Sequence, residues 1–153
     1  MSETDTSPLR GLLAPMGRCN LLVPGAMVAE VLAYSVPEPA GGPDWLLGQL
    51  FWHGSPLPCI DLECMATGTP AASSSRRRLL VLKRVDSVRH GEFLVMLVQG
   101  SPRLTHVRPD NLEPDPNGLH GTGIAAAVRL DGGPAVIPDF AAMDRLLNDL
   151  QPA

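Results

Sequence analysis

Short apolar runs recur along this chain between segments rich in glycine, proline and polar residues. Runs of this kind are typical of β-strands, whereas a surface helix needs a longer stretch with 3.6-residue periodicity. Outside the hairpin described next, the pattern predicts strands at 9–16, 19–23, 79–82, 93–98, 103–107, 124–130 and 135–137. The sequence therefore predicts an all-β domain with few helices.

The most informative stretch runs from Trp45 to Leu62. Two apolar runs there flank the turn sequence His53-Gly54-Ser55-Pro56 and predict a β-hairpin. Gly48 lies inside the first run, where a glycine marks a bulge or a close backbone approach. Both tryptophans of the chain, Trp45 and Trp52, lie in this hairpin. We therefore expect the hairpin to anchor the core, with at least one tryptophan largely buried.

Two segments show helical spacing. After Pro24-Gly25, the apolar residues of 26–33 share one face of a helical wheel and predict a short helix after the first hairpin. Near the end of the chain, Asp139 can cap a second helix. Its apolar stripe consists of Phe140, Met143, Leu146, Leu147 and Leu150. We expect this C-terminal helix to close the domain against one of the sheets.

The remaining segments are predicted as loops. Residues 1–8 are expected to form a disordered leader, and 35–44 is too rich in proline for regular structure. Lys83–Gly91 is predicted as a polar turn, and the small polar residues after Leu62 as an exposed connection. The expected organisation is one domain over residues 9–150, with two lobes joined around 66–78.

Composition restricts the classes of function. The chain has 153 residues and a formal net charge of −4, which argues against a nucleic-acid-binding protein. No apolar run approaches the length of about 18–20 residues that spans a bilayer, so no membrane insertion is expected. The acidic, polar start of the chain does not resemble a secretory signal. We expect a cytoplasmic protein.

The cysteines are candidates for metal binding or catalysis. Their number is three, which fits a reducing compartment better than a disulfide framework. Cys59 and Cys64 could in principle bind zinc with His53, but their spacing is not Cys-x-x-Cys and no second ligand pair follows. The favoured interpretation is that they are small buried hydrophobes. No metal and no cofactor are expected.

The motifs of common enzymes are missing from the sequence. The glycine pairs lack the strand-to-helix context of a phosphate-binding loop, and there is no Gly-x-Ser-x-Gly nucleophile elbow. A Cys59–His53 dyad is the one conceivable catalytic pair, and it lacks an orienting third group. We therefore expect no catalytic residues.

The hairpin resembles the signature of CheW-like domains, the adaptors that couple chemoreceptors to a histidine kinase. The matching residues are Gly48, Gly54, Pro58, Asp61 and Leu62, and His53 stands where the family usually has arginine. The resemblance extends over most of the chain, from Leu9 to Leu150. It implies two small five-stranded SH3-like β-barrel lobes, with Trp45–Leu62 in the first and Leu79–Ile137 mostly in the second.

The same resemblance implies a partner-binding site. Val28-Ala29-Glu30-Val31 matches a Val-x-Glu-(Ile/Val) element of the family, which lies near the receptor-binding groove with its glutamate close to the hairpin's arginine. From residue types alone, the valines would be core and Glu30 a solvated charge. The family resemblance makes the following residues candidates for partner binding: Val28, Glu30, Val31, His53 and Gly54. We expect Glu30 and His53 to lie close together at the mouth of the groove between the lobes.

The function implied by the resemblance is that of a non-enzymatic adaptor. Its partners would be the regulatory domain of a CheA-like histidine kinase and the cytoplasmic tip of a methyl-accepting chemoreceptor, with other CheW-like proteins as further candidates. His53, and Gln99 where the family often has aspartate, depart from the standard chemotaxis adaptor. Divergent members of this kind occur as accessory adaptors in pilus-type systems that control twitching motility, and by this analogy the chain resembles them. The alternatives are a small β-barrel module that binds peptides or proteins outside chemosensing and, less favoured, an enzyme using His53 and Cys59.

Overall fold

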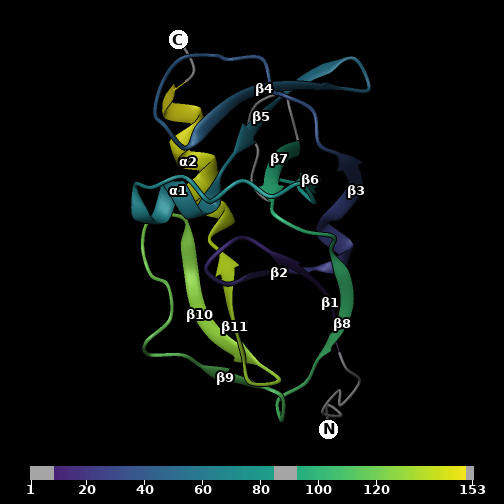
Figure 1. The fold of residues 1–153 in the computed structure, drawn as a ribbon, viewed down its shortest axis with the longest axis vertical. Helices are drawn as coiled ribbons and strands as arrows, with labels where there is room; N and C mark the ends of the chain where they lie inside the picture. Colours follow the sequence, from purple (N-terminus) through teal and green to yellow (C-terminus); the bar gives the residue numbers. More distant parts are fainter. Residues whose placement is uncertain (1–8, 85–92, 151–153) are drawn as a thin grey trace, which may run out of the picture.

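The computed structural model describes residues 9–84 and 93–150, which form two β-sheets, two α-helices and one 3-10 turn (Figure 1). The expected leader at 1–8 and most of the turn predicted at Lys83–Gly91 lie outside the described residues. The two sheets follow one another along the long axis (Figure 1). α1 (Leu62–Thr67) lies near the level where the sheets meet, and α2 (Phe140–Leu150) runs from that level along the side of the five-stranded sheet.

One sheet has six strands in the order β8-β1-β2-β11-β10-β9. Its strands are β1 (Leu9–Pro15), β2 (Asn20–Pro24), β8 (Arg103–Val107), β9 (Leu112–Pro114), β10 (Ile124–Leu130) and β11 (Gly133–Pro138). Neighbouring strands are antiparallel except β2 and β11, which pair in parallel. β8 and β9 are the two edges of this sheet.

The other sheet has five strands in the order β3-β6-β7-β5-β4. Its strands are β3 (Val28–Ala33), β4 (Leu46–Trp52), β5 (Ser55–Ile60), β6 (Arg78–Lys83) and β7 (Phe93–Val98). β5 and β7 pair in parallel, and the other neighbours are antiparallel. Gly48 lies at a register shift in β4, where an added Cβ would be 2.1 Å from the Glu38 carbonyl oxygen. The predicted bulge and close backbone approach are both confirmed.

The predicted all-β, two-part fold is confirmed, but the division of the chain between its parts is wrong. β6 and β7 join the sheet of β4 and β5, so the connection at 66–78 links strands of one sheet instead of separating two lobes. Five strands were expected in each part. The larger sheet has six, because the short strand β9 pairs with β10 at its edge. Only the strands from Arg103 onward return to the sheet that the N-terminal hairpin begins.

The helix predicted at 26–33 is confined to one 3-10 turn, η1 (Gly25–Met27), and is wrong beyond Met27. From Val28 the chain forms β3, which pairs with β6. The register of this pair shifts between Val28 and Glu30. Such a bulge breaks the alternation of inward and outward side chains, so the apolar residues took on helix-like spacing.

The two α-helices are capped by aspartates. α2 (Phe140–Leu150) is the predicted C-terminal helix, and Asp139 accepts a hydrogen bond from the Ala142 N–H at 3.0 Å. The sequence did not predict α1 (Leu62–Thr67), which Asp61 caps by accepting from the Cys64 N–H at 3.1 Å. Gly68, at φ 80°, ends α1 in the left-handed conformation that glycine adopts easily.

The core consists mainly of aliphatic side chains. Its largest cluster draws residues from both sheets and both helices, and two smaller clusters belong to one sheet each. Trp45 packs at the margin of the large cluster and Trp52 at the margin of the smaller cluster of the five-stranded sheet. Both tryptophans are partly buried and pack against the core, and neither belongs to its fully buried interior. The core is anchored by leucine, isoleucine and methionine instead.

Candidate partner-binding site

Glu30 is presented by an edge strand. β3 pairs only with β6, and Glu30 lies directly after the β3 bulge. A bulge changes the direction in which the following side chain points. Glu30 is exposed, and the next residue, Val31, has 43% of its surface exposed. This part of β3 is therefore accessible to a partner.

His53 and Gly54 form the two-residue turn between β4 and β5. Trp52 pairs with Ser55, and the two turn residues have φ angles of 50° and 79°. Positive φ at both positions is the geometry that twists two strands correctly into a tight hairpin. The predicted hairpin is confirmed, and its turn exposes the His53 side chain.

The turn and the edge strand meet at the Glu30 carboxylate. The Trp52 indole Nε1–H donates a hydrogen bond to Glu30 Oε1 at 3.0 Å. His53 Nε2 lies 3.8 Å from the same oxygen. The expected proximity of Glu30 and His53 is confirmed, and we call these three residues the Glu30 cluster.

Trp52 is the member of the Glu30 cluster that sequence reasoning missed, because it was assigned to the core alone. Its ring packs edge-to-face on Phe93 at 4.9 Å and against His53 at 4.2 Å between centroids. A partly buried indole needs an acceptor for its N–H, and that need was the available signal. Trp52 therefore combines packing with a fixed hydrogen-bond donor for Glu30.

The two contacts to Glu30 differ in strength. The side chains of His53 and Glu30 are 72% and 46% exposed, and exposed ion pairs contribute about 0–1 kcal/mol. The indole hydrogen bond comes from a half-buried ring, and it does not depend on protonation near neutral pH. Trp52 therefore orients the Glu30 carboxylate, and the contact with His53 is the weaker of the two.

The other predicted site residues are divided between surface and core. Val28 is half-buried and packs against the large core cluster, whereas Val31 is exposed. Gly54 is exposed, and a Cβ built on it would meet nothing within 4 Å. Four of the predicted site residues are thus available at the surface: Glu30, Val31, His53 and Gly54. Val28 instead packs β3 against the core.

The cysteines lie apart from this surface. Cys59 is fully buried, and burial together with the nearby Asp61 carboxylate raises its pKa to about 12. Burial and the Glu63 carboxylate likewise raise the pKa of Cys19 to about 11. Since His53 is at the exposed turn and Cys59 in the core, the structure does not bring this candidate pair together. In the described part of the chain, no three His, Cys, Asp or Glu residues are placed to hold a metal ion.

The signature residue Asp61 has a structural role. It is buried, caps α1, and its second carboxylate oxygen accepts from the Ala71 N–H at 3.2 Å. Gln99 is also buried, and its Oε1 accepts from the Ser74 N–H at 2.8 Å. Both residues fix the connection between α1 and β6 from beneath. Gln99 therefore does not mark an altered binding surface.

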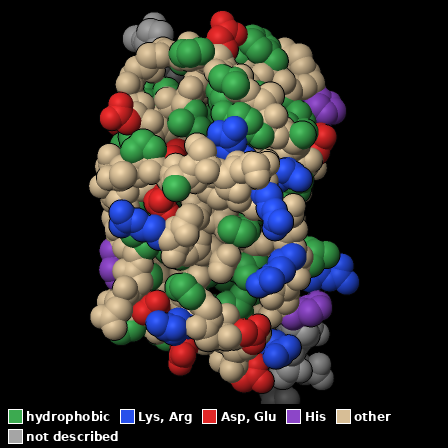
Figure 2. All heavy atoms as spheres, viewed as in Figure 1, with side chains coloured by type: hydrophobic (Ala, Val, Ile, Leu, Met, Phe, Trp, Pro, Cys, Tyr) green, Lys and Arg blue, Asp and Glu red, His purple; other side chains and the backbone are tan. Residues whose placement is uncertain are grey.

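Charge is mixed on the molecular surface. Figure 2 shows basic and acidic side chains on the same face, with hydrophobic side chains between them. Within residues 9–84 and 93–150, no helix has both the length and the apolar character needed to cross a bilayer.

Comparison with known proteins adds to this geometry. The model of a family described as CheW-like domain matches residues 10–147. Among solved structures, the chain is similar to the scaffolding protein TtCheW from Thermoanaerobacter tengcongensis, with a TM-score of 0.69 and 15% sequence identity. The alignment covers 91% of this chain and 89% of that one. A search of curated proteins gave no match.

Proposed function

The chain belongs to the CheW-like domain family, and from that premise we propose that it is a non-enzymatic adaptor that couples a chemoreceptor to a CheA-like histidine kinase. Its partners would be the regulatory domain of the kinase, the cytoplasmic tip of the receptor and other CheW-like proteins. The observation that carries this proposal is the Glu30 cluster, in which a β3 glutamate meets the β4–β5 turn as the family resemblance implies.

The proposed contact surface consists of exposed residues of β3 and the adjacent turn: Glu30, Val31, His53 and Gly54. An apolar side chain beside an oriented carboxylate provides both buried area and directional recognition. Val28 would act indirectly, by packing β3 on the core. We assign no chemistry to the cysteines, because burial raises the pKa of the Cys19, Cys59 and Cys64 thiols and keeps them protonated near neutral pH.

Within the family, the departure at His53 supports an accessory adaptor of a pilus-type system, which controls twitching motility. Gln99 lends this assignment no support, because it fixes a loop in the interior. The alternative is a peptide- or protein-binding module unrelated to chemosensing, and it makes different predictions about partners.

The test is calorimetric titration of the protein with the kinase regulatory domain and, separately, with the receptor tip. We expect saturable binding, weakened about tenfold by Val31→Asp, because a charge is then forced into an apolar contact. Glu113→Asp, an exposed change on β9 of the other sheet, is the control and should bind as wild type. Folded wild-type protein that binds neither partner would favour the unrelated module.

A further inference from the structure

The pairing of β3 with β6 places an arginine beside the proposed contact residue Val31. Val31 is opposite Leu80, and Ala33 is opposite Arg78. Side chains two residues apart on a strand point to the same face, so Val31 and Arg78 share one face of this sheet. Such diagonal neighbours lie about 7–8 Å apart, which is within reach of a long side chain. A partner that packs on Val31 therefore also meets Arg78.

Arg78 has no carboxylate within ion-pair distance among residues 9–84 and 93–150. Its Nη1 donates to the carbonyl oxygens of Arg76 and Arg77 at 3.1 and 2.8 Å, which holds the half-buried side chain in place. A guanidinium has five N–H donors, so those on Nε and Nη2 are left for a partner. The neighbouring Arg77 lies over the Tyr34 ring at 3.9 Å. Three successive cations make this end of β6 attractive to an anionic group.

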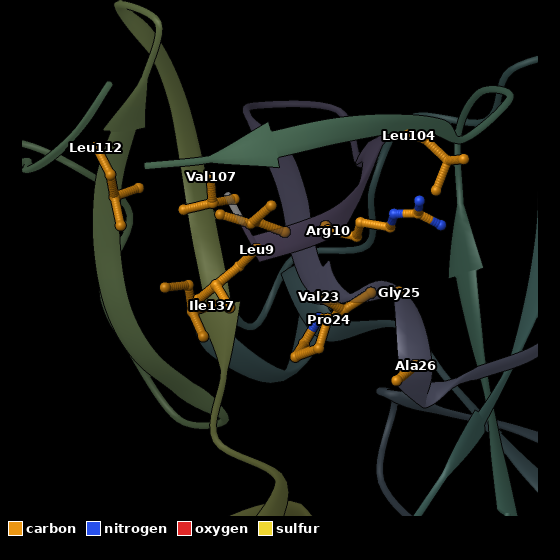
Figure 3. Close-up of a pocket in the computed structure, with 12 residues that line it drawn as sticks. Leu9, Arg10, Val23, Pro24, Gly25, Ala26, Leu104, Val107, Leu112 and Ile137 are labelled. Atoms are coloured by element: carbon orange, nitrogen blue, oxygen red, sulfur yellow. The ribbon is translucent and has the colours of Figure 1, made fainter. Parts of the chain in front are cut away.

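The six-stranded sheet presents the same combination of side chains. Arg10 is opposite His106 and Leu12 is opposite Leu104, so Arg10 and Leu104 are diagonal neighbours on one face of β1 and β8. Leu104 is 71% exposed, and the exposed Arg10 has no carboxylate partner in the part of the chain that the structure describes. In Figure 3 the Arg10 side chain extends toward Leu104 and away from Ile137. Each sheet thus places an exposed apolar side chain next to an arginine.

Both arginines lie on the faces that the two sheets turn toward each other. Leu80 and Leu12, which share these faces, belong to the one core cluster that draws residues from both sheets. The two regions are also close along the chain, because a Cβ on Gly25 of η1 would lie 3.6 Å from the Arg10 carbonyl oxygen, and η1 leads directly into β3. Figure 1 shows β3 and β8 along the same side of the molecule. The two arginines therefore flank one edge of the sheet junction.

Charge identifies the kind of partner that fits this edge. The whole chain has a formal net charge of −4, so an extended polyanion such as nucleic acid or an anionic membrane is repelled overall. A symmetric contact with a second copy would bring the same arginines together on both sides. A protein segment avoids both penalties, since it can place single carboxylates at the arginines and apolar side chains on Val31 and Leu104.

We propose that the segment of the chemoreceptor tip that packs on Val31 and Leu104 is acidic, and that its carboxylates pair with Arg78 and Arg10. This inference rests on the proposed function, because it takes Val31 as a receptor contact, and it adds the charge that the receptor segment carries. Guanidinium binds carboxylate through two parallel hydrogen bonds, which fixes the orientation of the partner. Complementary charges determine the choice of partner more than the affinity. Arg78 and Arg10 are therefore specificity-determining residues.

The test is calorimetric titration of the full chain with the receptor tip at about 50 and 300 mM NaCl, since salt screens exposed charges. We expect Arg78→Gln and Arg10→Gln each to weaken binding about two- to fivefold at the lower salt concentration, as for single exposed ion pairs, and to reduce the salt dependence. Arg78→Lys keeps the charge and should keep the salt dependence. Arg145→Gln, at an exposed position of α2, is the matched control and should bind as wild type. A merely structural role of Arg78 would not change the salt dependence.

Charge reversal identifies the receptor residue that pairs with Arg78. Arg78→Glu should weaken binding about tenfold or more, because repulsion replaces attraction. Each acidic residue of the receptor tip is changed to lysine in turn, and one of these changes should restore binding to Arg78→Glu in a double-mutant cycle. This inference alone is overturned if wild type binds the tip but folded Arg78→Gln or Arg10→Gln has the same affinity and salt dependence, or if no lysine variant restores binding. Wild-type protein that does not bind the tip at either salt concentration overturns the proposed receptor contact as well.

Discussion

At the scale of single residues, the Glu30 carboxylate is held in a fixed orientation although it lies exposed on the edge strand β3. An exposed glutamate on an edge strand has many rotamers, and ordering it has an entropic cost. Here the cost is offset by the Trp52 hydrogen bond, whose donor is itself held by Phe93. The histidine that replaces the family arginine adds a second, weaker contact. The family motif predicted that Glu30 and His53 lie close together. It did not predict the hydrogen bond from Trp52 to Glu30, because strand register decides which side chain of the β4–β5 hairpin lies next to Glu30.

Replacing Trp52 by phenylalanine separates its two roles. The ring is kept and the N–H is lost, so we expect unfolding free energy to fall by about 0.5–1.5 kcal/mol. Affinity for the kinase domain or receptor tip should fall several-fold, because Glu30 is no longer oriented. Urea unfolding and calorimetry measure these effects. Unchanged affinity in a folded Trp52→Phe variant would show that Trp52 does not orient Glu30 for binding.

The buried thiols predict alkaline destabilisation. The pKa of Cys59 is about 12 in the folded chain, against about 8.5 for an ordinary thiol. Between these values the unfolded chain releases the thiol proton and the folded chain keeps it, so the free energy of unfolding falls as pH rises above about 8.5. Urea unfolding from pH 7.5 to 10.5 should show a shallower fall in Cys59→Ala than in wild type. Equal slopes would contradict the role of Cys59.

At the scale of elements, the strands and helices differ in how well local sequence predicts them. Strands flanked by clear turns, such as β10 and β11, follow from the pattern, and the Gly48 bulge follows from a glycine inside a strand. β3 was not predicted from the pattern, because its bulge interrupts the two-residue alternation on which strand prediction depends. α1 was not predicted, because a helix of six residues is too short to show a 3.6-residue periodicity of apolar positions. Its Asp61 cap and Gly68 stop were the remaining signals.

The C-terminal helix is attached to the five-stranded sheet by a buried ion pair. Arg84 Nε donates to Asp144 Oδ1 at 2.5 Å, and both side chains are at most 5% exposed. Removing one partner leaves the other charge buried, so Arg84→Leu should cost about 3–5 kcal/mol in unfolding free energy.

The double variant Arg84→Leu/Asp144→Leu is the matched test of this pair, because no unpaired charge of the pair remains. It should recover most of the lost stability in urea unfolding. A double variant as unstable as the sum of the two single variants would show that the two charges do not depend on each other.

At the scale of the whole molecule, the sequence predicted the all-β class and the family but not the path of the chain between the sheets. The pairings that decide this path are β2 with β11 and β5 with β7, both parallel and both between segments far apart in sequence. No turn motif encodes such contacts, because parallel neighbours need a long crossover.

The central claim is that the chain couples a receptor to a kinase, and reconstitution tests it most directly. Kinase autophosphorylation would be measured with receptor-containing membranes, with and without this protein, and with Val31→Asp as the variant impaired at the proposed surface. We predict that receptor control of the kinase requires the protein and is lost with Val31→Asp, while Glu113→Asp supports control as wild type. Receptor control that is the same with and without the wild-type protein would contradict the account.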